Sequence, residues 1–96
     1  MMRTACPQFV DGRRVVCYSP IDARHQPTGN TVNIVGGMVL GPAAGVAICQ
    51  DQDSYYFVGC DENWDALSDS LHLTLEEAKR QAEFEYAGVS KTWVTV

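Results

Sequence analysis

Residues 54–88 constrain the fold more than any other part of the sequence, because they combine strand signals with a helix that is punctuated at both ends. Residues 55–60 are apolar on both alternating faces, a pattern typical of a strand that is covered on both sides. Asp61, Glu62 and Asn63 predict a three-residue hairpin loop. The returning strand is expected over residues 64–70. This region therefore predicts an antiparallel hairpin followed by a helix.

The helix is predicted to begin after Thr74, because a threonine N-cap with Glu77 three positions later forms a capping box. Gly88 provides the left-handed position at which helices end. One narrow apolar stripe at helical spacing is expected to face the core, and it consists of Leu75, Ala78, Ala82 and Tyr86. Phe84 lies on the opposite side, where it either contacts Val89 just beyond the helix or forms part of an exposed interface.

The remaining sequence predicts further strands separated by loops. Strands are expected over residues 14–18, 31–35, 37–40 and 46–50, with the last two forming a pair joined by a Gly-Pro turn. Residues 1–13 are expected to be loose, and residues 19–30 to form a long loop. The uncharged run at 34–49 is too short and too rich in glycine to cross a bilayer as a helix, so we expect no membrane association.

A chain of 96 residues is long enough for a single domain with its own core, spanning residues 1–96. The predicted fold class is α+β, an antiparallel sheet (meander) of four to six strands with one C-terminal helix packed on one face. Because the apolar stripe of the helix is narrow, the rest of the sheet has to be covered by the N-terminal segment, the C-terminal tail or a second subunit.

Charge is unevenly distributed along the chain. The net charge is −5, which disfavours binding to the phosphate backbone of nucleic acids. Residues 51–87 contain ten acidic and two basic residues, a local charge of −8, whereas residues 1–24 carry a local charge of +2 and residues 25–50 carry none. An acidic face of this kind either is simply solvated or attracts a basic partner.

The four cysteines, at positions 6, 17, 49 and 60, are expected to be free thiols. No export signal is recognisable at the start of the sequence, so a cytoplasmic location is expected, and disulfides are rare there. Cys49 and Cys60 fall in apolar strand-like runs, where a thiol behaves as a small hydrophobic group.

No metal, cofactor or catalytic site is predicted. Asp61, Asn63 and Asp65 have the spacing of the start of a calcium loop, but the sixth position is Ala66 instead of glycine and the twelfth is His72 instead of glutamate. Zinc sites usually contain close Cys or His pairs, and the sequence has none. No flanking motif marks any cysteine as a nucleophile.

The segment from residue 60 to residue 93 resembles a group of small uncharacterised bacterial proteins. The shared features are a Cys-Asp pair followed by a Trp, a Thr-x-Glu-Glu-Ala-Lys helix that continues Gln-Ala-Glu-Phe-Glu-Tyr before a Gly, and a late Thr-Trp. The resemblance covers about the last 40 residues and implies a bacterial α+β domain. It implies no activity and no site residues. Small acidic bacterial proteins of this class are often immunity proteins.

The leading hypothesis is therefore a non-enzymatic, acidic protein-binding module, of the kind that neutralises a basic toxin domain. The residues expected to contact the partner are the acids and two aromatic anchors near the hairpin and the end of the helix: Asp61, Glu62, Trp64, Asp65, Asp69, Glu83, Phe84 and Glu85. Two alternatives remain open. One is a homodimer or larger homo-oligomer joined through the strand at 55–60 or through a sheet edge. The other is a small-molecule binder with a pocket between the 19–30 loop and the sheet.

Overall fold

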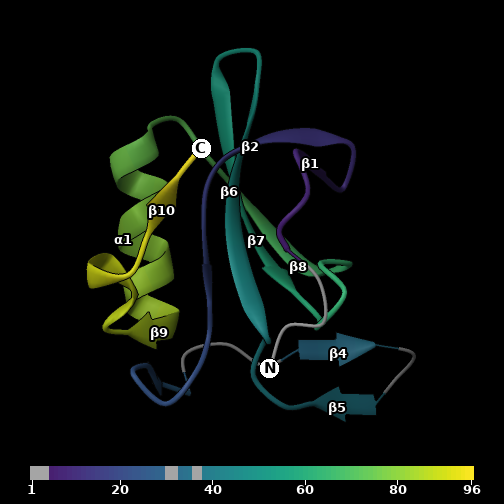
Figure 1. Ribbon diagram of the computed structural model, residues 1–96, viewed down its shortest axis with the longest axis vertical. Helices are drawn as coiled ribbons and strands as arrows, with labels where there is room; N and C mark the ends of the chain where they lie inside the picture. The colour runs from purple at the N-terminus through teal and green to yellow at the C-terminus, as the bar shows by residue number, and fades with distance from the viewer. Residues whose placement is uncertain (1–4, 30–32, 36–37) are drawn as a thin grey trace.

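The computed structural model describes residues 5–29, 33–35 and 38–96, and it has an α+β fold, as predicted. A curled antiparallel sheet contains β1 (Phe9–Val10), β2 (Arg13–Pro20), β6 (Gly45–Asp51), β7 (Ser54–Cys60) and β8 (Ala66–His72), in that order. A short strand, β10 (Val94–Thr95), also pairs with β2, on the same side as β1. The α-helix α1 (Leu75–Glu85) lies to one side of this sheet (Figure 1).

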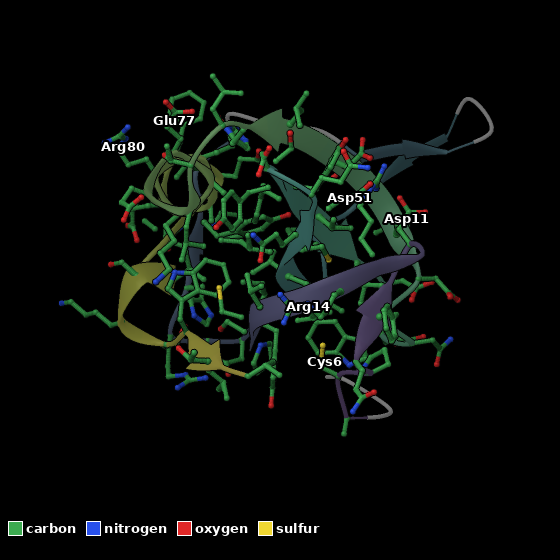
Figure 2. All side chains as sticks on the ribbon, turned by 90° about the horizontal axis from the view of Figure 1, so that it is seen from above. Cys6, Asp11, Arg14, Asp51, Glu77 and Arg80 are labelled. Atoms are coloured by element: carbon green, nitrogen blue, oxygen red, sulfur yellow. The ribbon has the colours of Figure 1, made fainter. Side chains whose placement is uncertain are left out.

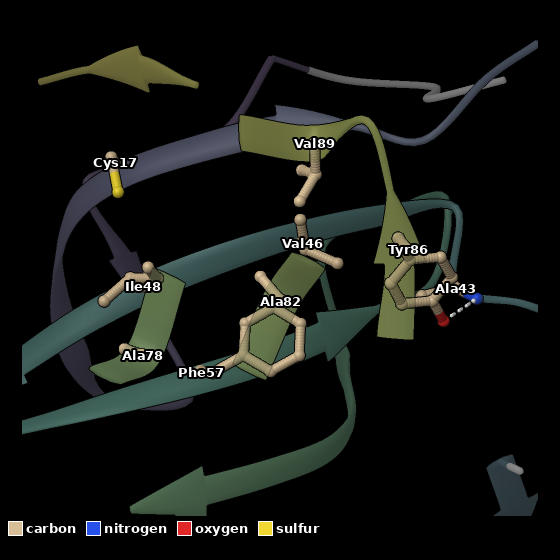
Figure 3. Packing of buried hydrophobic residues seen from close by; sticks show 9 residues of the cluster. All are labelled: Cys17, Ala43, Val46, Ile48, Phe57, Ala78, Ala82, Tyr86 and Val89. Atoms are coloured by element: carbon tan, nitrogen blue, oxygen red, sulfur yellow. Dashed lines mark hydrogen bonds between the residues drawn. The ribbon is translucent and has the colours of Figure 1, made fainter. Parts of the chain in front are cut away.

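The helix packs on the sheet through the stripe that its sequence predicts. Ala78 and Ala82 are fully buried and Tyr86 is 2% exposed, and they lie against Ile48 and Phe57 of the sheet (Figure 3). Small alanine side chains allow the helix to approach the strands closely. The packing therefore confirms the predicted orientation of α1.

The two ends of α1 are formed in different ways. At the first end, the Thr74 side chain accepts a hydrogen bond from the Glu77 backbone N–H (3.1 Å), as the capping box predicts. The Glu77 carboxylate bonds to the N–H of Leu73 (3.3 Å). At the second end, the helix stops at Glu85 and the chain extends into β9 (Tyr86–Ala87), which pairs with β3 (Gln26–Pro27). The helix thus ends earlier than predicted from Gly88.

Gly88 is left-handed, with φ 99°, but it precedes the 3-10 helix η1 (Val89–Lys91) instead of capping α1. Val89 is fully buried in the core beneath α1. The loop predicted over residues 19–30 is shorter in the structure. β2 extends to Pro20, and Gln26–Pro27 form β3, which pairs with β9.

The opposite face of the sheet has its own core, which explains why both faces of β6 and β7 are apolar. Val10, Val15, Cys49, Val58 and Trp64 are buried there. The prediction that residues 1–13 are loose is therefore wrong for residues 9–13, because β1 pairs with β2 and Val10 is only 2% exposed. A β-bulge between Val15 and Cys17 directs these two side chains to opposite faces of the sheet.

The glycine-rich region forms a different pairing from the one predicted. β4 (Asn33–Val35) and β5 (Met38–Leu40) pair with each other as a separate two-stranded sheet, and β5 does not pair with β6. The segment from Gly41 to Ala44 connects the two sheets and is held by tertiary bonds, including one from the Ala43 N–H to the Tyr86 hydroxyl (2.9 Å; Figure 3). Gly36 and Gly37 lie outside the described residues.

Candidate functional site

Three of the acids that are expected to contact a partner, Asp61, Glu62 and Asp65, lie in the β7–β8 turn, which consists of residues 61–65. Asp61 Oδ1 accepts hydrogen bonds from the backbone N–H groups of Asn63 (2.8 Å) and Asp65 (3.0 Å). These bonds draw two more residues into the turn than predicted, so β8 begins at Ala66. Glu62 and Asp65 are exposed. Asp61 therefore holds the turn in shape, and Glu62 and Asp65 present their carboxylates at its surface.

Trp64 is a core residue and not a surface anchor. Its backbone adopts a left-handed conformation (φ 65°), and the residue is 4% exposed. The ring meets Tyr18 edge to face, with centroids 5.7 Å apart and planes at 84°. The expectation that Trp64 contacts a partner is therefore wrong, because the turn directs its ring against the sheet.

Asp69 is paired within the molecule. Its carboxylate lies 3.6 Å from the Arg13 guanidinium, which also contacts Asp11 at 2.9 Å. Arg13 stacks over the Tyr56 ring, 3.7 Å from the centroid. Arg13 thus links the β1–β2 turn to β7 and β8 across one face of the sheet, and the charge of Asp69 is partly neutralised.

Glu83 and Glu85 also have structural roles. The Glu83 carboxylate accepts the backbone N–H groups of Gly88 (2.8 Å) and Ser90 (3.0 Å). Burial acts to raise the pKa of Glu83, but these hydrogen bonds outweigh it and lower the pKa below its usual value. Glu85 is 8% exposed and accepts a bond from Gln81 Nε2 (2.6 Å). Phe84, which lies between these two acids, is 54% exposed and is the one large apolar side chain of residues 83–85 at the surface.

The acids of residues 51–87 do not form one continuous face. Asp51 ends β6 and Asp53 lies in the β6–β7 turn, whereas Glu62 and Asp65 lie in the β7–β8 turn at the other end of β7. Seven residues of strand separate these ends, on the order of 20 Å. In Figure 2, which views the molecule from above, Glu77 lies at α1, to one side of the molecule and away from both Asp51 and Asp11. The acidic surface is therefore distributed over both ends of the sheet.

The structure contains a buried polar network in the region that the sequence predicts to be a long loop, residues 19–30. His25 is 6% exposed, and its Nδ1 accepts the backbone N–H of Asp22 (3.0 Å). Its Nε2 is therefore the donor to the Thr92 hydroxyl (2.8 Å) in the neutral ring. Thr92 in turn bonds to Ser19, which is fully buried and donates to the Pro20 carbonyl. The network ties β2 to the C-terminal segment, and no local sequence signal indicates it.

The thiols are held in an unreactive form. All four cysteines are free, as predicted, and three are buried. Burial raises the pKa of Cys6 and Cys17 to about 11 and that of Cys49 and Cys60 to about 12. Since the thiolate is the reactive species, these groups are poor nucleophiles at neutral pH.

A shallow groove of about 260 Å³ lies where β1 and the C-terminal residue flank β2, and it is lined by Gln8, Phe9, Arg14, Val15 and Val96. Its lining contains no residue of the 19–30 segment, where the sequence predicts a pocket. Among the described residues, no three His, Cys, Asp or Glu side chains are grouped to hold a metal ion. In the same part of the chain, no helix is long and apolar enough to span a membrane.

Comparison with known proteins found no matching family model, curated protein or solved structure. The functional interpretation therefore depends on the geometry described above.

Proposed function

We propose that this protein is a non-enzymatic protein-binding module for a basic protein partner. The observation that carries the proposal is the β7–β8 turn, in which the Asp61 carboxylate organises the backbone while Glu62 and Asp65 remain exposed. An acidic group on an ordered turn loses little conformational entropy when a cationic partner binds. In its more specific form, the proposal is that the partner is a toxin domain that this protein neutralises.

Charge and side-chain chemistry both support this assignment. The net charge of −5 favours rapid encounter with a basic surface. Ser19 is fully buried, and burial raises the pKa of the Cys49 and Cys60 thiols to about 12, which favours a binding role over nucleophilic chemistry at these groups.

The test is to capture the partner on the immobilised chain at low salt, identify it, and measure its association rate with purified components. The double variant Glu62→Gln/Asp65→Asn is expected to lower the rate about tenfold and to flatten its dependence on salt. The control Asp51→Asn/Asp53→Asn removes the same charge from the other end of β7. If both variants lower the association rate equally, the β7–β8 turn acts only through the net charge of the protein, and the proposed site is contradicted.

The toxin form of the proposal has a separate test. Co-expression of the chain with the captured partner should restore growth to cells that the partner alone inhibits, and Glu62→Gln/Asp65→Asn should weaken the rescue. A partner that does not inhibit growth would exclude neutralisation while leaving the binding module in place.

A further inference from the structure

The two edges of the main sheet differ in how they are protected. One edge is formed by β1 and β10, two strands of two residues each that both pair with β2. Very short edge strands are a common protection against pairing with another chain. The other edge is β8, a strand of seven residues that, within residues 5–29, 33–35 and 38–96, pairs only with β7. β4 approaches β8, but in the part of the chain that the structure describes β4 and β5 pair with each other and not with β8.

The register shows which backbone groups of β8 face outward. Asp51 and Ser54 flank the two-residue β6–β7 turn and form a hydrogen-bonded pair, so alternate residues of β7 point toward β6 and toward β8. Tyr55 and Phe57 then bond to His72 and Ser70. The backbone groups of the β8 residues between these pairs, Asp69 and Leu71, therefore point away from the sheet, whereas Leu67 lies in a β-bulge where this alternation is interrupted.

Side chains along this edge favour contact with another chain. Leu71 is 58% exposed and Leu73, just after the strand, is 73% exposed. β8 contains neither lysine nor proline, the residues that usually prevent pairing at an edge. Asp69 is the one Asp, Glu, Lys or Arg residue of β8, and its ion pair with Arg13 reduces its ability to prevent pairing with another strand.

Acidic residues are placed at both ends of β8. Asp65 immediately precedes the strand in the β7–β8 turn, and Glu76 and Glu77 follow it in the first turn of α1. A second copy of the chain would bring two such acidic ends together, so the charges favour a basic occupant.

We propose that the outer edge of β8 accepts an extended, lysine- or arginine-containing segment of a protein partner as an added strand. Outward backbone groups of β8 would provide the hydrogen bonds, Leu71 and Leu73 the apolar contacts, and the flanking acids the preference for cationic side chains. The inference rests on the proposed function, because it takes the partner to be basic, and it adds the binding mode.

The test uses a short capped peptide of alternating lysine and valine, with a glutamate–valine peptide as the charge control. Amide hydrogen exchange is followed by NMR on the isotopically labelled full chain. The basic peptide should slow exchange of the outward N–H groups of Asp69 and Leu71 about tenfold, with little change at Ser68 and Ser70, which already bond to β7. Raising the salt concentration should reverse the effect.

Variants separate backbone pairing from side-chain contact. Leu71→Pro removes an outward N–H, a change that an edge strand tolerates, and it should abolish the peptide-induced protection of β8 from exchange. Leu71→Ser retains the N–H and should only weaken this protection. If Leu71→Pro does not fold, Leu71→Lys/Leu73→Lys provides the alternative, because it places repelling cations on the edge. Retained protection in the folded proline variant or in the lysine variant would overturn the proposal.

Three other outcomes would overturn it in distinguishable ways. Peptide-induced shifts at Glu62 and Asp65 without protection of β8 would exclude strand addition and leave the proposed function standing. Equal protection by the glutamate–valine peptide would remove the charge preference. Protection of β8 that grows with protein concentration in the absence of peptide, with a dimer seen by light scattering, would assign the edge to a second copy. The proposed function is tested separately, by the association rate of the partner with Glu62→Gln/Asp65→Asn.

Discussion

At the scale of single residues, Trp64 and Phe84 show how little the identity of an aromatic side chain says about its exposure. Both were expected at a binding surface, yet Trp64 is 4% exposed and Phe84 is 54% exposed. The difference arises in the backbone, because the left-handed conformation of Trp64 turns its ring under the β7–β8 turn and against Tyr18. Phe84 lies on the side of α1 opposite the core stripe.

This difference predicts unequal costs of truncation. Trp64→Ala should lower the free energy of unfolding by about 3–5 kcal/mol, because it removes a large buried ring and leaves a cavity. Phe84→Ala should cost less than about 1 kcal/mol. Urea unfolding followed by circular dichroism measures both values. Similar costs for the two variants would contradict the burial described for Trp64.

The His25 network makes a second prediction at this scale. Thr92→Val removes the hydroxyl that links His25 to Ser19, so the buried His25 Nε2 and the Ser19 hydroxyl each lose one hydrogen bond, at a cost of about 1–3 kcal/mol. Thr95→Val makes the same chemical change at an exposed position of β10 and should cost less than about 0.5 kcal/mol. Thermal unfolding of the two variants compares them directly, and equal midpoints would show that the network contributes nothing.

At the scale of elements, the two ends of α1 have different origins. The first end depends on neighbours in sequence, since Thr74 and Glu77 are three residues apart. The second end depends on Thr28, whose hydroxyl donates to the carbonyl of Phe84 (2.6 Å) and whose N–H donates to that of Glu85 (3.1 Å). Helix carbonyls need such partners at the end of a helix. A residue 57 positions away therefore satisfies the end of the helix.

Gly88 provides a test of the connection that follows α1. It has φ 99°, and a Cβ atom there would lie 2.9 Å from the Arg24 carbonyl oxygen. Gly88→Ala should therefore cost about 3 kcal/mol, from backbone strain and the clash together. The control Gly12→Ala has φ 76° but meets nothing within 4 Å, and should cost about 1 kcal/mol. Chemical denaturation of both variants tests the difference, and equal losses would argue against the contact with Arg24.

At the scale of the whole molecule, both faces of the central sheet are covered by the chain itself. α1 covers one face, and β1 with Trp64 covers the other. β7 lies between β6 and β8, so its doubly apolar pattern reflects internal packing and it is not available as the seam of an oligomer. Exposed acids remain at both ends of the sheet, and the edge of β8 remains open to a partner.

Acid should destabilise the whole fold through two carboxylates with depressed pKa values. Hydrogen bonds from Arg24 lower the pKa of Asp22 from 3.8 to about 2, and the pKa of Glu83 is also lowered. Their contribution to stability is present above the unfolded-state values and is lost as the pH falls from about 4.5 toward 2. Urea unfolding across this range should show a shallower pH dependence for Glu83→Gln than for the unchanged chain. Identical slopes would exclude a contribution from Glu83.

The sequence by itself determined the features that arise between near neighbours. These are the hairpin of β7 and β8, the start of α1 at Thr74, the stripe that α1 buries, and the α+β class. Capping and side-chain periodicity act over a few residues, so a single sequence contains their signals.

Tertiary structure decided what depends on groups far apart in the chain. It placed Trp64 in the core, paired Asp69 with Arg13, ended α1 through Thr28, and assembled the network of His25 and Ser19. It also divided the acidic run between the two ends of β7 and left β8 at an edge of the sheet. Each outcome depends on strand order and chain direction, which bring distant residues together and which local patterns do not encode.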